Sequence, residues 1–298
     1  LLGESGSSAF LLDPSQEKLG FILLGFLSAI YPIAMFFAAP ILGALSDKYG
    51  RRPVLLISIL GTAVGYFLFT WAIVIKNIPL LFFSRLVDGL TGGNISTVQA
   101  SITDQVDPEH RAKAFGLMGA TFGIGFILGP FIGGKLADPH VLPWFNASTP
   151  FLFAGILAFV NFLSIYLFFV ETNMHIDKDR VIKFFSSVSN LFKIKKLNHE
   201  LRYLLIVSFL FNAGFAFFTS FFNVYLTNHF NFSVGEIGNF FGYIGICSIL
   251  TQLVVVRYVS SKFSHISILR FAYPAVAIAT VLYLLPDQSW WLFVITPF

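Results

Sequence analysis

Long apolar runs alternate with short polar segments along nearly the whole chain. A helix of about 20 apolar residues is long enough to cross the hydrocarbon core of a membrane. The pattern therefore predicts an all-α, polytopic membrane protein, with eight complete spanning helices and a ninth that begins at Trp290. The predicted spans are 20–45, 54–75, 79–103, 113–137, 149–170, 203–227, 236–256 and 268–286.

Composition supports a membrane protein and argues against several other classes. Only 11% of the 298 residues are charged and 56% are hydrophobic, whereas soluble globular proteins are about 25% charged. The single cysteine, Cys247, excludes a disulfide framework within the chain and a cysteine-based metal site. The histidines are scattered and no phosphate-binding G-x-x-x-x-G-K-[ST] motif occurs, so we expect no metal, no cofactor, no enzyme and no ATP-driven pump.

The distribution of Lys and Arg predicts the orientation. Alternate connections carry 15 of these residues on one side and 3 on the other. Basic residues of membrane proteins collect on the cytoplasmic side, so their distribution indicates the topology. The net charge of +4 therefore does not indicate nucleic-acid binding, and we expect no nucleic-acid partner. The connections predicted to be cytoplasmic in a cell membrane are 46–53, 104–112, 171–202 and 257–267. The first span then runs inward, so we expect another span before Leu1 and a longer helix beyond Phe298.

A short internal similarity suggests two halves in parallel orientation. Residues 44–55 resemble residues 258–269, and both segments follow a span that runs inward. Parallel repeats of this kind occur in transporters. We therefore predict an N-terminal half over 1–170, a basic linker over 171–202 and a C-terminal half over 203–298.

Two charged residues lie inside a predicted span. Arg85 and Asp88 are three residues apart, so they share a helix face and can pair. Each charge costs about 2.5 kcal/mol or more near the membrane centre. The same face continues through Gly92, Ser96 and Gln99 as a polar stripe. Either the pair only offsets its own burial, or it lines a water-accessible path with Asp88 as a proton carrier. We favour the second interpretation for Arg85 and leave both open for Asp88.

The segment GALSDKYGRRP, residues 43–53, interrupts the apolar pattern with four charges. Gly50 suits a left-handed turn position, and Pro53 suits the first turn of the next helix. Asp47 follows the end of a predicted helix, where the helix dipole disfavours an anion. We therefore expect Asp47 to have a partner, either a nearby arginine or the N-terminus of another helix.

The span 113–137 contains seven glycines and Pro130. Glycine and proline weaken a helix, but in lipid small residues let helices approach closely. The span is therefore expected to pack against another helix and to provide a place where helices bend or slide.

Three motifs resemble signatures of the major facilitator superfamily. Residues 43–53 are similar to its G-x-L-(S/A)-D-x-x-G-R-(R/K)-P loop signature, and RLVDGLTGG resembles its R-x-x-x-G-x-x-G pattern. The glycine-rich span matches the antiporter signature G-x8-G-x3-G-P-x2-G-G, and residues 101–116 resemble tetracycline and multidrug proton antiporters. The signature positions are Gly116, Gly125, Gly129, Pro130, Gly133 and Gly134.

The resemblance implies a bundle of two pseudo-symmetric halves that exports small amphipathic organic compounds in exchange for protons, as a monomer in the bilayer and without a cofactor. It implies proton coupling at Arg85, while Asp88 is supported by the physical argument alone. It also implies that Asp47 meets the start of an eleventh helix outside residues 1–298. The residues of the implied gating loop are Gly43, Asp47, Gly50, Arg51 and Arg52. The alternatives are an uptake symporter and a transport-inactive sensor or scaffold.

Polar residues in the spans are weaker candidates for a substrate cavity, because each is as well suited to bond neighbouring helices. These candidates are Gln99, Asn212, Asn223, Tyr225 and Gln252.

Overall fold

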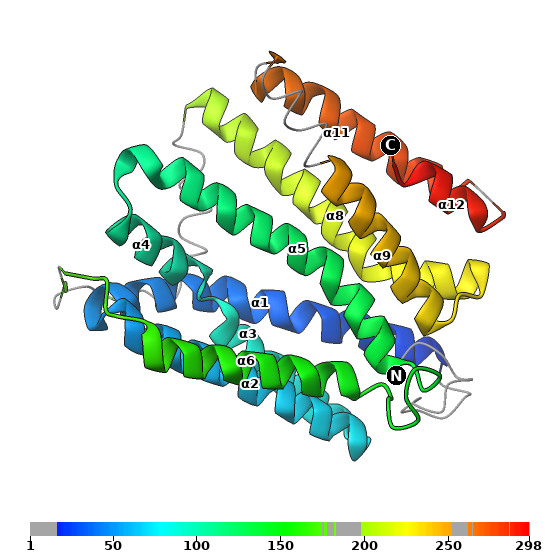
Figure 1. The fold of residues 1–298 in the computed structure, drawn as a ribbon, viewed down its shortest axis with the longest axis horizontal. Helices are drawn as coiled ribbons and strands as arrows, with labels where there is room; N and C mark the ends of the chain where they lie inside the picture. The colour runs from blue at the N-terminus through cyan, green and yellow to red at the C-terminus, as the bar shows by residue number, and fades with distance from the viewer. Residues whose placement is uncertain are drawn as a thin grey trace. The chain divides into compact units, whose positions relative to one another are not determined.

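The computed structural model of the chain describes residues 17–174, 176–177, 182, 198–251, 262–263, 265–285 and 287–297. All elements in these ranges are helices, which confirms the all-α prediction (Figure 1). Five of the described helices are long and apolar enough to cross a membrane. The elements are α1 (Glu17–Tyr49), α2 (Arg51–Val74), α3 (Ile78–Gly92), α4 (Ile95–Gln105), the 3-10 turn η2 (Pro108–His110), α5 (Arg111–Ala137), α6 (Thr149–Phe168), α8 (His199–Phe230), α9 (Val234–Leu250), α11 (His265–Leu282) and α12 (Trp290–Ile295).

The predicted span 79–103 is broken in the structure. Helix α3 ends at Gly92 and α4 begins at Ile95. The sequence Gly92-Gly93-Asn94 has low helix propensity. In addition, Gly93 lies so close to α1 that a Cβ atom there would be 2.7 Å from the backbone nitrogen of Ala39. Weak propensity and close packing against α1 together account for the break.

The prediction of a loop over 46–53 is wrong. Helix α1 continues to Tyr49 and α2 begins at Arg51, so Gly50 alone separates them. Gly50 has φ 99° and ψ 159°, a conformation that is essentially restricted to glycine. The expected positive φ at Gly50 is therefore confirmed, and residues 43–53 form a sharp corner between two helices, here called the α1–α2 corner.

The described helices divide into two compact units by packing. The first comprises the described residues within 1–119 and 144–197, and the second comprises those within 120–143 and 198–298. The second part of α5 thus packs with the C-terminal helices, although it precedes the predicted boundary at 170. The pseudo-symmetry of the predicted halves stays a prediction, since much of the second repeat, 258–269, lies outside the described residues.

In the first unit, α2 packs against α3 and α6, and α1 packs against α3 (Figure 1). Leu27 of α1, Phe69 of α2 and Leu81 of α3 belong to its buried core. Glycines bring these helices close together: a Cβ on Gly89 would be 2.7 Å from the Cβ of Ala34, and one on Gly92 would be 2.8 Å from the Tyr31 hydroxyl. The two glycines of the R-x-x-x-G-x-x-G pattern are therefore contact points between α3 and α1.

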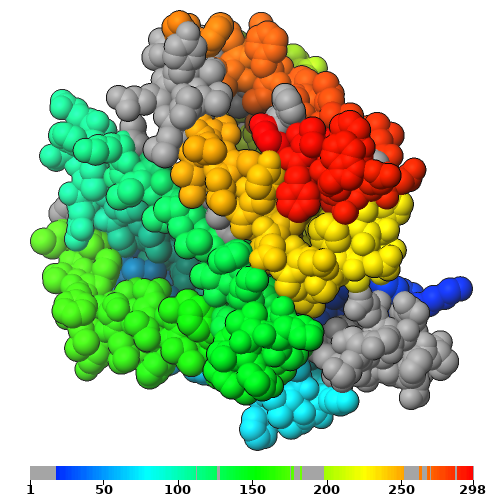
Figure 2. Space-filling model, turned by 45° about the vertical axis from the view of Figure 1, so that its right-hand side comes forward, coloured from blue at the N-terminus to red at the C-terminus, as the bar shows by residue number. Residues whose placement is uncertain are grey.

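The second unit has an aromatic core. Phe222 and Leu226 of α8 are buried against Phe240 of α9 and Leu292 of α12. Figure 2 shows α12 (red) lying against the surface of α8 and α9 (yellow to gold). Ser233 and Glu236 form a reciprocal capping box that starts α9.

Candidate functional site

Arg85 and Asp88 form a buried ion pair on α3. The Arg85 Nη1 atom lies 3.1 Å from the Asp88 Oδ2 atom, and Asp88 is 2% exposed. The guanidinium stands 4.4 Å from the ring centre of Phe69 on α2, a favourable cation–π distance. The close approach of the two helices depends on Gly65 of α2, where a Cβ would be 2.9 Å from the Cβ of Asp88. The pairing expected from the spacing is confirmed.

The pair leaves part of the arginine unbonded. Among the described residues, the Nε and Nη2 atoms of Arg85 are buried without a hydrogen-bond partner. Asp88 is the anion that pairs with this guanidinium, which also lies 5.1 Å from the ring centre of Tyr66. Neutralising Asp88 would leave a buried, unpaired positive charge, which is strongly unfavourable.

The predicted polar stripe does not continue past Gly92. Ser96 and Gln99 lie on α4, beyond the break, and Ser96 donates its hydroxyl hydrogen to the Ala39 carbonyl at 3.2 Å. Gln99 is exposed. The expectation of one stripe on one helix is therefore wrong, because the turn after Gly92 changes the helix direction.

Arg51 connects the α1–α2 corner to α4. Its Nη1 atom donates to the Ser46 hydroxyl at 2.7 Å and to the Asp47 carboxylate, and its Nε atom donates to Asp104 Oδ2 at 3.0 Å. A nearby arginine is thus a partner of Asp47, as one of the two expectations had it. A contact of Asp47 with an eleventh helix stays a prediction. The motif did not identify Asp104, which is 53 residues from Arg51.

Glu171 completes the start of α2. Its Oε1 accepts the backbone N–H of Arg51 at 2.8 Å and its Oε2 accepts that of Arg52 at 3.0 Å. Oε1 also accepts the N–H groups of Thr172 at 3.0 Å and Asn173 at 2.9 Å. Partial burial acts to raise the pKa of the Glu171 carboxyl, but these four N–H groups outweigh it and hold the pKa below its ordinary value.

Glu171 was not among the residues predicted from the sequence, although its position carries a signal. The residue follows the C-terminal end of α6, where an anion is disfavoured by the dipole. The reasoning that singled out Asp47 applies equally to Glu171.

The other two corner residues have separate contacts. The Nη2 atom of Arg52 donates to the Tyr166 carbonyl of α6 at 2.7 Å. The Gly43 carbonyl accepts from the Ser46 hydroxyl at 2.8 Å, and a Cβ on Gly43 would be an ordinary 3.5 Å from Ser96 Oγ. Gly43 is therefore less constrained than Gly50.

The glycines of the antiporter signature differ in their surroundings. A Cβ on Gly134 would lie 2.8 Å from the Cα of Gly238, so α5 and α9 are in close backbone contact there. Among the described residues, no atom outside the local helix backbone lies within 4 Å of a Cβ placed on the remaining signature glycines, Gly116, Gly125, Gly129 and Gly133. Pro130 lies inside α5. The predicted close packing is thus present at the Gly134 end of the motif.

The candidate cavity residues are not gathered in one place. Asn212 is exposed and donates to the Ser208 carbonyl of its own helix at 2.7 Å, and Asn223 is also exposed. Tyr225 donates to the Tyr283 carbonyl at 3.1 Å, so it bonds two segments of the second unit. Gln252 lies outside the described residues.

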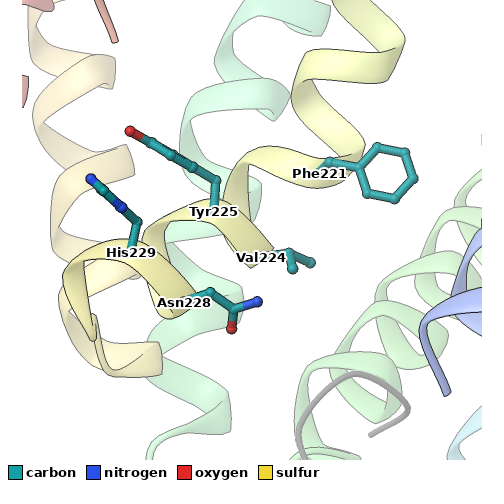
Figure 3. A pocket seen from close by; sticks show the side chains of 5 residues that line it. All are labelled: Phe221, Val224, Tyr225, Asn228 and His229. Carbon is teal, nitrogen blue, oxygen red and sulfur yellow. The ribbon is translucent and has the colours of Figure 1, made fainter. Parts of the chain in front are cut away.

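A shallow hollow lies on α8. Its volume is about 380 Å³, and its lining residues are Phe221, Val224, Tyr225, Asn228 and His229. Tyr225 and His229 extend to one side of the helix and Phe221 to the other (Figure 3). All five side chains come from one helix and leave the hollow open, so it does not identify a substrate.

Comparisons with known proteins agree with these features. A family model described as Major Facilitator Superfamily matches residues 2–298. The chain is 38% identical over 148 residues to the class H tetracycline resistance protein of Pasteurella multocida, covering 50% of the chain and 35% of that protein. It is 42% identical over 139 residues to the class C protein of Escherichia coli, covering 47% of the chain and 33% of that protein. The aligned segments thus span about a third of these relatives.

A solved structure shows the same fold. The crystal structure described as the human organic anion transporter MFSD10 (TETRAN) aligns with a TM-score of 0.70 at 22% identity. The alignment covers 96% of this chain and 68% of that chain.

Proposed function

The chain belongs to the Major Facilitator Superfamily, and we propose that the protein is a proton-coupled antiporter that exports small amphipathic organic compounds by alternating access. Membership and the apolar helices make it a multi-pass integral membrane protein. The placement in a cell membrane, with the α1–α2 corner on the cytoplasmic side, is part of the proposal and rests on the distribution of Lys and Arg.

The observation that carries the proposal is the buried Arg85–Asp88 pair. A carboxylate that is 2% exposed inside a membrane helix is costly to keep. Similarity to tetracycline resistance proteins supports an efflux role, and the antiporter signature favours exchange over symport.

The pair can couple the protonation state of Asp88 to the packing of α3. With Asp88 ionised, the charge of Arg85 is compensated at 3.1 Å. A proton on Asp88 removes that compensation and leaves an unpaired guanidinium against Phe69. We propose that this change favours a second arrangement of α3, in which Arg85 reaches water or another acceptor, and that substrate binding and proton binding alternate between the two arrangements.

The test is transport by the full-length gene product in proteoliposomes. An imposed proton gradient should drive tetracycline movement, and tetracycline should drive proton movement in the opposite direction. Asp88→Asn and Arg85→Ala should each abolish coupled exchange. Asp107→Asn, which removes an exposed acid between α4 and α5, serves as the matched control and should keep wild-type rates. Undiminished exchange in both pair variants would refute the assigned roles.

The same vesicles separate the alternatives. Movement of protons and substrate in the same direction would establish a symporter. An absence of flux for tetracycline and for a panel of organic anions and cations would favour a sensor or scaffold. Organic anions belong in the panel because the human protein with the same fold is described as an organic anion transporter.

A further inference from the structure

The segment that follows α6 is bonded to the α1–α2 corner. We infer that Glu171 is a positioning residue for transport, and that the post-α6 segment, residues 171–174, 176 and 177, holds the corner in the shape that transport requires. This inference rests on the proposed function, because it concerns how the corner takes part in the transport cycle.

The carboxylate of Glu171 caps the start of α2. The first N–H groups of a helix have no partner within the helix, and an anion at that end is also favoured by the dipole. Glu171 supplies one oxygen to the N–H of Arg51 and the other to the N–H of Arg52. The N-cap position is Gly50, which has no side chain to offer. An acid about 120 residues away in the chain therefore does what a local Ser or Asp does in other helices.

Gly50 lies against the same carboxylate. A Cβ at this position would lie 2.9 Å from the Cδ atom of Glu171. The carboxylate thus occupies the space that any other residue type would need, and φ 99° already disfavours a side chain there. The Glu171 carboxylate can therefore reach the start of α2 only because residue 50 is a glycine, and the corner motif by itself does not explain this dependence.

The post-α6 segment also bonds the end of α1. The side-chain amide of Asn173 donates to the Asp47 carbonyl at 3.2 Å and to the Ser46 carbonyl at 3.4 Å. The backbone N–H of Asp177 donates to the Asp47 carbonyl at 3.1 Å. The last carbonyls of a helix need donors, so the post-α6 segment gives donors to the end of α1 and acceptors to the start of α2.

These contacts have a mechanical consequence. The segment bonds the corner backbone on both sides of Gly50, at Ser46 and Asp47 and at Arg51 and Arg52. A movement of the segment away from the corner would break these bonds, so the corner keeps its shape only while the segment stays in place.

The experiment combines hydrogen exchange with transport in the full-length gene product. Glu171→Ala should speed amide exchange in the peptide around Arg51 and Arg52 by about tenfold, the usual effect of losing a helix cap. Glu171→Gln, which keeps one oxygen acceptor, should give an intermediate rate. The transport Vmax should fall in the same order with KM for tetracycline unchanged, because Glu171 lies outside the spanning helices. Glu109→Gln, an exposed acid, is the control and should change neither readout.

A second variant keeps the inference testable if Glu171→Ala fails to fold. Asn173→Ala removes the two side-chain bonds to the end of α1 and leaves the start of α2 intact, so it should lower Vmax without faster exchange at Arg51 and Arg52. Wild-type exchange in Glu171→Ala would show that the contact is not formed. Faster exchange with an unchanged Vmax would overturn the positioning role. If wild-type protein moves no substrate, the proposed function fails, while the exchange experiment still decides whether the contact exists.

Discussion

Gly50→Ala is the substitution whose effect the structure defines most sharply. Two terms contribute. Placing alanine at φ 99° and ψ 159° costs about 1–3 kcal/mol in backbone strain. The new methyl group also displaces the Glu171 carboxylate, which removes a helix cap worth about 0.5–2 kcal/mol. We therefore expect the free energy of unfolding to fall by about 1.5–5 kcal/mol.

The assay is denaturant unfolding of the purified protein in detergent, with Gly43→Ala as a matched control. Gly43 lies within α1, and its added methyl group would stand an ordinary 3.5 Å from Ser96 Oγ. Alanine is favoured over glycine inside a helix, so this control should gain about 0.5–1 kcal/mol. The two substitutions in one corner should thus have opposite signs.

A double-mutant cycle tests the reasoning further. Each single substitution removes the same helix cap, and the double variant Gly50→Ala/Glu171→Ala can lose it only once. The decrease in the free energy of unfolding of the double variant should therefore be smaller than the sum of the two single decreases by about 0.5–2 kcal/mol. Equal effects of Gly43→Ala and Gly50→Ala, or strict additivity in the cycle, would refute the account of Gly50 as the residue matched to Glu171.

Three further predictions follow from the contacts. Arg51→Lys should lower the free energy of unfolding by about 1 kcal/mol, and less at high salt, because a lysine cannot bond both carboxylates and the Asp104 side chain is 26% exposed; an unchanged unfolding midpoint at low salt would contradict this. Because the pKa of Glu171 is lowered in the folded state, its contribution to stability should be complete above the ordinary value of 4.5 and should be lost progressively as pH falls from there through the lowered pKa. The stability difference between wild type and Glu171→Gln, measured by unfolding from pH 7 to pH 4, should therefore shrink at the acid end; a constant difference would argue against a charged contact. Gly134→Ala should cost about 1–3 kcal/mol by overpacking against Gly238, whereas Gly129→Ala should be neutral or stabilising in the same assay; reversal of that order would refute the α5–α9 contact.

Features that depend on local sequence could be predicted from the sequence alone. The spans follow from apolar runs, because the lipid core requires a continuous apolar helix with its backbone bonded internally. The Arg85–Asp88 pair follows from a spacing of three residues on one helix. The positive φ of Gly50 follows from its position between two helical runs. None of these features needs information about a distant part of the chain.

Tertiary structure decided the rest, because periodicity carries no information on which distant residues meet. Arg51 bonds Asp104 on α4, and Glu171 completes the start of α2 from beyond α6. The contact of Gly93 with α1 accompanies the break between α3 and α4, and so divides the polar stripe that the sequence indicated. The sequence could show that Asp47 needed a partner, because the dipole of its own helix is a local property. The packing of the helices decides that Arg51 both pairs with Asp47 and bonds Asp104 on α4.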